Sequence, residues 1–209
     1  MMMGPATEQL VGSVSRETTE RLDLLVSLVT KWNPTVNLVS RSTLAQIWER
    51  HIADSAQLFP LRPEVCSHWV DLGSGGGFPG LVIAILFAEH TPDVRVSLVE
   101  SDQRKAAFLR EASRLLAVGT NVLCNRSDAL EHLRADVVSA RALAPLTVLC
   151  DMAYRHLKPE GVALYMKGRG HAAELKAAKT SWRFALTSTQ SKTDPGAAIL
   201  RLSTIRKAH

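Results

Sequence analysis

The chain has 209 residues, of which 46% are hydrophobic and 22% are charged, and its formal net charge at pH 7 is +5. This length accommodates one full α/β domain with a modest extension, and the composition is ordinary for a globular protein. The longest apolar run, residues 81–88, is too short to span a bilayer. We expect no signal peptide, and three cysteines without a Cys-x-x-Cys spacing predict reduced thiols in a cytoplasmic protein.

The basic excess is concentrated near the C-terminus. Residues 1–140 contain 13 Lys or Arg and 16 Asp or Glu, whereas residues 141–209 contain 12 and 4. Such an excess is typical of proteins that bind a polyanion, but it also fits the solvated surface of helices and a hairpin. Charge alone therefore does not decide whether the chain binds nucleic acid.

The first third of the chain has the periodicity of helices. Apolar residues recur at helical spacing between 22 and 29, and the Asn33-Pro34 pair is expected to end that helix. A second helix is predicted over residues 42–58. Two prolines then mark the boundary between a helical extension, residues 1–62, and a domain that comprises residues 63–209.

From residue 68 onward, short apolar runs alternate with helical segments, which predicts a mostly parallel sheet. The expected strands are Trp69–Leu72, Arg95–Val99, Asn121–Cys124, Asp136–Ser139 and Val162–Met166. The expected helices between them are Pro79–Glu89, Gln103–Leu116, Ala129–Leu133 and Leu146–Leu157. Two further strands, Trp182–Thr189 and Ala198–Ile205, are joined by a turn at residues 194–196 and read as a hairpin.

The most informative segment is Trp-Val-Asp-Leu-Gly-Ser-Gly-Gly-Gly-Phe-Pro-Gly at residues 69–80. A strand, a glycine loop and a helix N-terminus together suit a nucleotide-sized cofactor. A dinucleotide fold requires Gly-x-Gly-x-x-Gly, but Phe78 occupies the third glycine position. With the terminal hairpin, the pattern resembles class I S-adenosylmethionine-dependent methyltransferases, in a Rossmann-like fold with a seven-stranded sheet. That resemblance implies cofactor contacts from Asp71, Gly73, Ser74, Gly75 and Phe78.

Two further strand ends carry polar residues that suit a nucleoside. Glu100 ends the second strand, where a carboxylate can accept hydrogen bonds from both ribose hydroxyls, a device that NAD-binding proteins also use. Ser127 and Asp128 follow the third strand, beside which the adenine is expected. Asp128 is equally suited to accept the adenine amino hydrogen and to cap a helix.

Several segments together resemble one family, RsmG, also called GidB, from about residue 20 to residue 206. They are Trp32–Val39, His51–Ser55, the glycine loop, Glu100–Leu109, Ser139–Ala142 and Lys167–Gly168. The resemblance implies a bacterial enzyme that methylates guanine N7 at nucleotide 527 of 16S rRNA. It also implies S-adenosylmethionine as cofactor and 16S rRNA, or a precursor of the small ribosomal subunit, as partner. We expect a monomer.

The chemistry also bears on candidate catalytic residues. Guanine N7 has a free lone pair and no proton, so its methylation needs no general base. Arg141 ends the fourth strand and is expected to hold guanine O6 or a phosphate, with its charge offset by Asp54, or to form a structural ion pair. Because it lies at the cofactor edge of the sheet, Arg141 is also expected among the cofactor contacts. His51 and Asp54 share a helix face and are expected to link the helical extension to the active site by hydrogen bonds. A purely structural role fits both residues as well as substrate contact does. A metal site would need more ligands than these two residues, and no third His or Cys is placed to supply one.

Asn37, Lys167 and Arg169 are the expected RNA contacts, with a structural role for Asn37 and a solvated loop for the other two as the alternatives. Three other functions fit less well. A methyltransferase of small molecules or proteins would not explain the basic C-terminal third, and a dehydrogenase would not explain Phe78. An RNA-binding protein without activity would not need Asp71, the glycines and Glu100.

Overall fold

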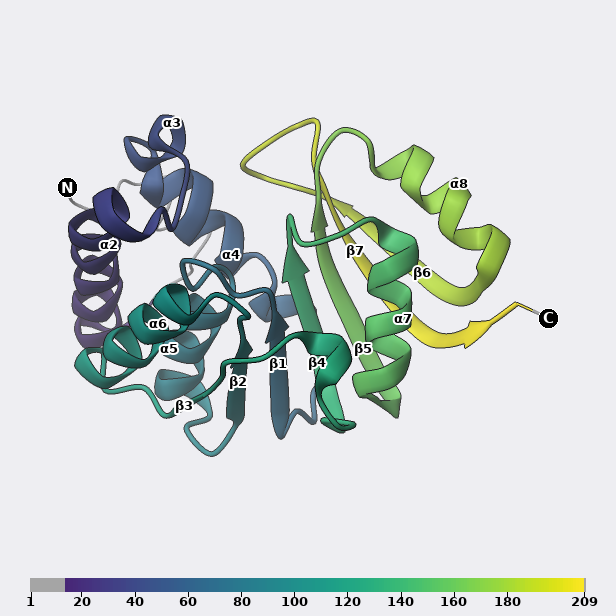
Figure 1. Ribbon diagram of the computed structural model, residues 1–209, viewed down its shortest axis with the longest axis horizontal. Helices are drawn as coiled ribbons and strands as arrows, with labels where there is room; N and C mark the ends of the chain where they lie inside the picture. The colour runs from purple at the N-terminus through teal and green to yellow at the C-terminus, as the bar shows by residue number, and fades with distance from the viewer. Residues whose placement is uncertain (1–13, 209) are drawn as a thin grey trace.

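The computed structural model describes residues 14–208, so residues 1–13 of the expected helical extension lie outside the described part. Its centre is a seven-stranded sheet with the order β3-β2-β1-β4-β5-β7-β6 (Figure 1). The first five strands in this order are parallel, and β7 is antiparallel to both of its neighbours. The predicted class I methyltransferase topology is therefore confirmed. The strands are β1 His68–Leu72, β2 Arg95–Val99, β3 Thr120–Leu123, β4 Ala135–Arg141, β5 Leu157–Lys167, β6 Trp182–Gln190 and β7 Ala198–Lys207.

Helices cover both faces of the sheet through two hydrophobic clusters. One cluster joins the sheet to α2, α5 and α6, and the other joins it to α7 and α8. The predicted apolar run is α5, whose residues 80–87 are buried because the sheet lies on one side and α2 and the short helix α4 Asp54–Ala56 on the other. No helix within residues 14–208 is long and apolar enough to cross a membrane. The helices are α2 Arg16–Val36, α5 Gly80–His90, α6 Gln103–Leu115, α7 Leu146–His156 and α8 His171–Ser181.

The first helix is longer than the sequence predicted. Ser15 caps α2, and its hydroxyl accepts a hydrogen bond from the Thr18 amide at 3.1 Å. The predicted end at Asn33-Pro34 was wrong, because the helix continues to Val36 with Pro34 in its last turn. Asn37 ends it in the left-handed region at φ 55°, and its amide donates to the Asn33 carbonyl oxygen at 3.0 Å.

The predicted helix over residues 42–58 was also wrong as a single regular element. The chain forms the short helix α3 Arg41–Leu44, the π-helix η1 Trp48–Ala53 and the short helix α4 Asp54–Ala56, and a 3₁₀ turn η2 Phe59–Leu61 follows. A π-helix is wider than an α-helix, so it changes which side chains share a face. The segment that carries His51 is therefore positioned by packing and not by an α-helical period.

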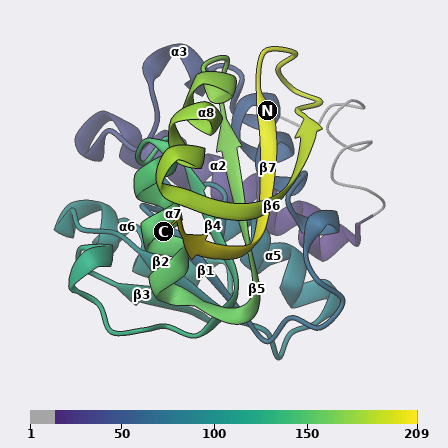
Figure 2. The same ribbon diagram turned by 90° about the vertical axis from the view of Figure 1, so that its right-hand side faces the viewer.

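Two further differences lie near the other helical layer. The predicted helix Ala129–Leu133 is absent, and only a 3₁₀ turn η3 Ser127–Ala129 forms. Side chains of α7 hold this turn, because Arg155 and His156 each donate a hydrogen bond of 2.9 Å to its carbonyl oxygens. The predicted helix has five residues, and a helix of that length is marginal unless other elements pack against it. The helix α8 was not predicted. Figure 2 shows it beside the β6–β7 hairpin.

Candidate functional site

Two adjoining cavities open at the carboxyl edge of the sheet. The first, of about 340 Å³, is lined by the ends of β2 and β3 and is called the β2 cavity. The second, of about 640 Å³, is lined by residues 38–54, the end of β5 and the β6–β7 loop and is called the hairpin cavity. Both volumes are typical of small-molecule sites. The cavities meet at five shared residues, which are Gly73, Gly75, Lys105, Arg141 and Ala142.

The glycine loop, residues 73–77, lies where the two cavities meet. Gly73 and Gly75 have φ angles of 66° and 53°, which glycine adopts without steric cost. A Cβ atom on Gly73 would come within 2.5 Å of Leu143 Cδ1, whereas one on Gly75 would meet nothing nearer than the Gly73 carbonyl oxygen at 3.8 Å. The α-carbon of Gly75 therefore faces open space, and a bound molecule can approach the backbone there.

Hydrogen bonds fix this loop to the sheet. The Ser74 amide donates to the Val99 carbonyl oxygen at 3.0 Å, and the buried Ser74 hydroxyl donates to the Asp71 carbonyl oxygen at 3.0 Å. Ser74 also lines the hairpin cavity through the part of its surface that remains exposed. The loop conformation is thus set by the protein before any ligand binds.

The structure corrects the expected position of Asp71. Its side chain is 0% exposed and lines neither cavity, because it lies behind the glycine loop. Its Oδ1 accepts a hydrogen bond from the Ser139 hydroxyl at 2.7 Å, and its Oδ2 accepts one from the Gly80 amide at 3.2 Å. Burial raises the pKa of this carboxyl to about 6. Asp71 therefore supports the loop and the start of α5 from inside the protein.

Glu100 lies where the sequence placed it, on the wall of the β2 cavity. Its Oε2 accepts a hydrogen bond from the Gly75 amide at 2.9 Å, and its Oε1 accepts one from the Asp102 amide at 2.8 Å. Each carboxylate oxygen can accept a second hydrogen bond. The residue thus both braces the glycine loop and offers acceptors to a ligand in the cavity.

Ser127 and Asp128 line the far end of the β2 cavity. The Asp128 carboxylate is paired with the Arg126 guanidinium through contacts of 3.1 and 2.9 Å, and this hydrogen bonding lowers its pKa. Since no α-helix forms over residues 129–133, the alternative in which Asp128 caps that helix was wrong. The Ser127 carbonyl oxygen is occupied by His156, so the backbone of this corner is held rigidly at the cavity edge.

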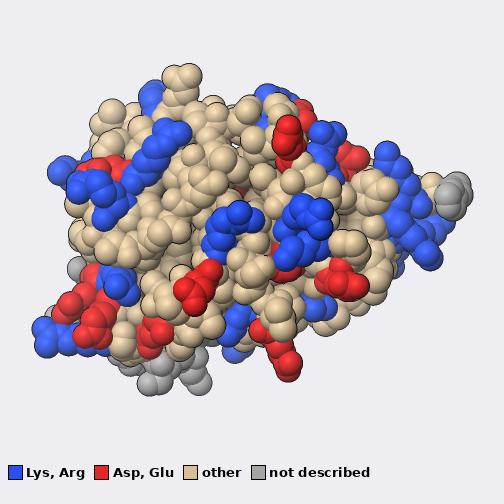
Figure 3. Space-filling view, turned by 90° about the horizontal axis from the view of Figure 1, so that it is seen from below, with Lys and Arg blue, Asp and Glu red and all other residues tan. Residues whose placement is uncertain are grey.

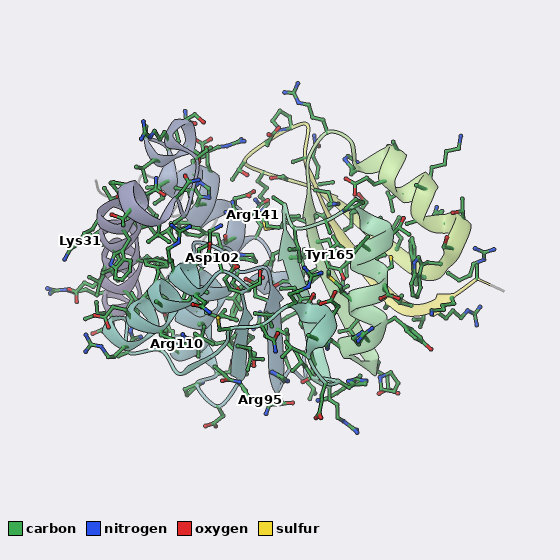
Figure 4. The ribbon with its side chains drawn as sticks, in the orientation of Figure 1. Lys31, Arg95, Asp102, Arg110, Arg141 and Tyr165 are labelled. Carbon is green, nitrogen blue, oxygen red and sulfur yellow. The ribbon has the colours of Figure 1, made fainter. Side chains whose placement is uncertain are left out.

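Arg141 is the central side chain of the hairpin cavity. It ends β4, and Ala142 turns the chain away with a φ of 52°. Its Nη1 donates to the Arg50 carbonyl oxygen at 3.0 Å and lies 3.7 Å from Asp54 Oδ2, while its Nη2 contacts His51 Nδ1 at 2.7 Å. Only 19% of its side chain is exposed. The expected cluster of Arg141, His51 and Asp54 is therefore present. Figure 4 labels Arg141, which lies near the upper end of the strands.

His51 is held as a neutral ring with a defined tautomer. Since Arg141 can only donate, His51 Nδ1 must accept, and the ring proton lies on Nε2, which contacts the Thr43 hydroxyl at 2.9 Å. Burial and the nearby Arg141 and Arg50 charges lower the pKa of His51 to about 3. Phe78 packs 4.9 Å from the imidazole, between ring centroids, and 5.5 Å from the Arg141 guanidinium carbon.

Asp54 joins Arg141 to the β6–β7 loop. Its Oδ1 accepts hydrogen bonds from the Thr193 hydroxyl at 2.6 Å and from the Ser191 hydroxyl at 3.3 Å. Gln57 reinforces this connection, because its Oε1 accepts the Lys192 amide at 2.7 Å. A segment near residue 50 and a loop near residue 193 therefore form one wall of the hairpin cavity.

The expected RNA contacts are not brought together. Asn37 is exposed at the end of α2 and lines neither cavity. Lys167 lines the hairpin cavity, but it is only 8% exposed, and its ammonium binds Glu174 Oε2 at 2.7 Å and the Ala144 carbonyl oxygen at 2.8 Å. Arg169 is exposed and packs against Gly196, outside both cavities. Lys167 is therefore an internal ion pair and not a free phosphate ligand, which corrects the prediction.

Sequence reasoning missed several residues that line or build the cavities. Lys105 lines both cavities. It lies in the first turn of α6, the helix that follows Glu100 at the end of β2, and this position in the sequence could have indicated a site residue. Gln57, Ser191 and Thr193 carried no such signal, because they meet only after the chain folds across more than 130 residues.

The basic excess of the C-terminal third is not gathered at the cavities. Figure 3, a view from below Figure 1, shows Lys and Arg side chains clustered at the end of the molecule where the last strands lie. The two basic residues of this third that line the β2 cavity or the hairpin cavity, Arg141 and Lys167, are each paired with a carboxylate. The charge distribution that suggested a polyanion therefore does not itself mark the binding site.

Comparison with known sequences identifies related proteins along almost the whole chain. A family model described as rRNA small subunit methyltransferase G matches residues 18–197. A protein of Cereibacter sphaeroides with the name ribosomal RNA small subunit methyltransferase G is 53% identical over 190 residues, which cover 91% of each chain. A protein of Paracoccus denitrificans with the same name is 52% identical over 197 residues, which cover 94% of this chain and all of the other.

Comparison with solved structures agrees on the fold. A mutant of MtNAS in complex with S-adenosylmethionine has a TM-score of 0.56 at 22% identity and covers 88% of this chain and 71% of that chain. The TYW2 protein of M. jannaschii in complex with AdoMet has a TM-score of 0.54 at 16% identity, with coverage of 82% and 78%. At these identities, the likeness establishes the fold alone.

Proposed function

The chain belongs to the rRNA small subunit methyltransferase G family, and from this premise we propose that it methylates N7 of guanine 527 in 16S rRNA. The enzyme is an S-adenosylmethionine-dependent rRNA methyltransferase, and the position and atom are the proposed part. The proposal places the reaction in the cytoplasm, where ribosomal subunits are assembled. The observation that carries it is the meeting of two cavities of different character at one glycine loop.

The β2 cavity fits the cofactor. The open space over Gly75 admits a ligand against the backbone, and Glu100 offers carboxylate oxygens at the end of β2, where a ribose is bound in doubly wound sheets. Ser127 and Asp128 border the far end, where the adenine would lie. When bound, the cofactor supplies an electrophilic methyl group on a sulfonium. Gly73, Gly75 and Arg141 border the point where this cavity joins the next.

The hairpin cavity is the proposed site of the target guanine. Phe78 and the neutral His51 ring offer an aromatic wall, and Arg141 contributes a guanidinium at its base. Since Arg141 is already bonded to His51 and to the Arg50 carbonyl oxygen, it does not need to occupy the N7 lone pair. Its free surface is available to guanine O6 or to a phosphate.

The charges of this wall suit methylation at N7. The purine gains positive charge as N7 accepts the methyl group, so an uncompensated cation beside it would oppose the reaction. Asp54 offsets the Arg141 charge at 3.7 Å, and His51 is uncharged because its pKa is lowered to about 3. N7 carries no proton, so no side chain has to act as a base. We assign catalysis to in-line placement of the two reactants, which can supply roughly 7–11 kcal/mol.

Mapping of N7-methylguanine in 16S rRNA tests the proposal. We expect cells that lack this gene to lose the modification at nucleotide 527 and to regain it when the wild-type gene is restored. A variant with Glu100→Gln is the matched control, because it should fold but restore the modification poorly. An unchanged modification pattern in the deletion strain would overturn the proposal, and loss at a different nucleotide would overturn the assigned position.

A further inference from the structure

Lys105 differs from every other cation that lines the two cavities. Five Lys or Arg residues line them, and within residues 14–208 four of these have a carboxylate partner. The pairs are Arg50–Asp194 at 3.3 Å, Arg126–Asp128 at 2.9 Å, Arg141–Asp54 at 3.7 Å and Lys167–Glu174 at 2.7 Å. Lys105 forms no ion pair among the described residues. Its ammonium therefore remains available to an incoming anion.

The two carboxylates near Lys105, Asp102 and Glu100, accept backbone amides and form no ion pair with its ammonium among the described residues. Asp102 caps α6, where its Oδ1 accepts the amides of Arg104 and Lys105 at 2.8 and 3.2 Å, and its Oδ2 lies 3.5 Å from the Arg104 guanidinium. Glu100 accepts two backbone amides and has no ion-pair partner in the described part of the chain. The local acids thus hold the loop and the helix start and leave the Lys105 charge unneutralised.

The position of Lys105 indicates which anion it binds. It is half-buried in the first turn of α6 and borders both cavities, whereas the Arg141 guanidinium lies deeper, with 19% of its side chain exposed. A nucleotide that places its base in the hairpin cavity keeps its sugar and phosphates nearer to solvent, at this outer border. An ammonium with three donors on a flexible stem suits a phosphate approached from solvent.

We propose that Lys105 binds a backbone phosphate next to the target nucleotide and so positions the RNA strand over the junction of the two cavities. This inference rests on the proposed function, because it assumes an RNA substrate. It assigns Lys105 to substrate positioning and not to cofactor binding. The alternative anion at this junction, the carboxylate of S-adenosylmethionine, becomes an outcome that the experiment distinguishes.

The test compares Lys105→Gln and Lys105→Arg with Arg114→Gln, all in the full-length chain. Arg114 lies on the same helix, is 68% exposed and is paired with Glu111, so its replacement removes the same charge away from the cavities. Glutamine and lysine have similar helix propensities, so folding should be preserved. Methylation of small ribosomal subunits from cells lacking this gene is measured at several KCl concentrations, and the dissociation constants of S-adenosylmethionine and 5′-methylthioadenosine are measured by calorimetry.

We expect Lys105→Gln to raise the KM for the subunits roughly fivefold at low salt. The slope of log KM against log [KCl] should fall by about 0.7–0.9, which is the value for one lost phosphate contact. Lys105→Arg should keep most of the slope, and Arg114→Gln should match the wild type. Cofactor affinity should change less than about twofold in all three.

Two results would overturn the inference. One is an unchanged KM and salt slope in Lys105→Gln. The other is a loss of affinity for S-adenosylmethionine without a loss for 5′-methylthioadenosine, which would assign Lys105 to the cofactor carboxylate. Failure of the proposed function is separately visible, because the wild-type protein itself would then fail to methylate the subunits.

Discussion

The two edges of the sheet contain the same hydrogen bond in different surroundings. At the carboxyl edge, Arg141 Nη2 contacts His51 Nδ1 at 2.7 Å, and at the amino edge, Arg95 Nη2 contacts His68 Nδ1 at 2.8 Å. Figure 4 labels both arginines, which lie at opposite ends of the strands. In each pair, the second ring nitrogen contacts a hydroxyl group at 2.9 Å, and burial is the main cause that lowers the histidine pKa.

The surroundings separate the two pairs. Arg141 borders two cavities and faces Asp54, whereas Arg95 lies beside neither cavity, and its partner His68 is buried in β1. A buried arginine–histidine contact is thus a structural device that fixes a neutral ring in one tautomer. Position beside a cavity, and not the contact itself, is what supports the role in the reaction that we propose for Arg141 and His51.

We expect the largest effect from a side chain that fills the open space over the glycine loop at the carboxyl edge. In Gly75→Leu, the new side chain would project into the open space over the glycine loop, and the positive φ would add a smaller steric cost. We expect the affinity for S-adenosylmethionine, measured by calorimetry, to fall at least about 100-fold, which is roughly 2.7 kcal/mol. Gly119→Leu is the control, since Gly119 is exposed with free space around it. Cofactor binding that survives in Gly75→Leu would contradict the assignment of the cavity.

Removal of the arginine from each edge tests the comparison itself. Arg141→Met leaves Asp54 and the Arg50 carbonyl oxygen without their partner, so we expect kcat/KM for rRNA methylation to fall about 100-fold, while cofactor affinity changes less than about threefold. Arg95→Met removes the matching contact at the amino edge and should leave kcat/KM unchanged. Equal losses in both variants would mean that the contacts act only through stability.

The pH dependence of stability should be shared by both edges. The folded pKa of His51, about 3, lies below the unfolded value of 6.5, so protons bind the unfolded chain first as the pH falls. The free energy of unfolding is unaffected by this titration well above pH 6.5, and it should fall by roughly 2.7 kcal/mol on acidification to pH 4.5. His68, with a pKa lowered to about 4, acts in the same direction.

Urea unfolding of the wild type, His51→Gln and His68→Gln between pH 4.5 and 7 measures this dependence. Each substitution should flatten the loss of stability on acidification. A variant whose pH dependence matches that of the wild type would show that the replaced histidine is not held neutral.

The smallest effect is expected at Asn37. It lies at the helix end with φ 55°, where alanine is less favourable than asparagine, so Asn37→Ala should cost about 1 kcal/mol of stability. Its exposed side chain lines neither cavity, and kcat/KM should stay within about twofold of the wild type. A tenfold loss of kcat/KM at unchanged stability would instead support the RNA contact that the sequence predicted.

The β2 cavity was largely predictable because its walls come directly after strands. Glu100, Gly73 and Gly75 follow apolar runs whose carboxyl ends meet at one edge of a parallel sheet, so position along the chain implied position in space. The exception was Asp71. Strand alternation does not reveal which end residue points into the cavity and which lies behind the loop, and here Ser139 and Gly80 hold it inside.

The hairpin cavity was only partly predictable. The contact of Asp54 with Thr193 joins residues 139 positions apart, and no local pattern encodes it. The π-helix η1 is set by packing, because regular propensity predicted an α-helix over the same residues. Lys167 was predicted as a phosphate ligand because its partner Glu174 lies on α8, a helix that was not predicted from the sequence. The Ala, Leu, Glu and Lys content of this segment favours a helix, but its amphipathic pattern is weak.

The central claim is that the cofactor binds in the β2 cavity and the target guanine in the hairpin cavity. Calorimetric titration of S-adenosylmethionine into Glu100→Gln and Asp54→Asn tests it most directly, because each variant changes one oxygen of a carboxylate in one cavity. We predict that the dissociation constant rises at least about tenfold in Glu100→Gln and less than about threefold in Asp54→Asn. Unchanged affinity in Glu100→Gln, or an equal loss in Asp54→Asn, would contradict the claim.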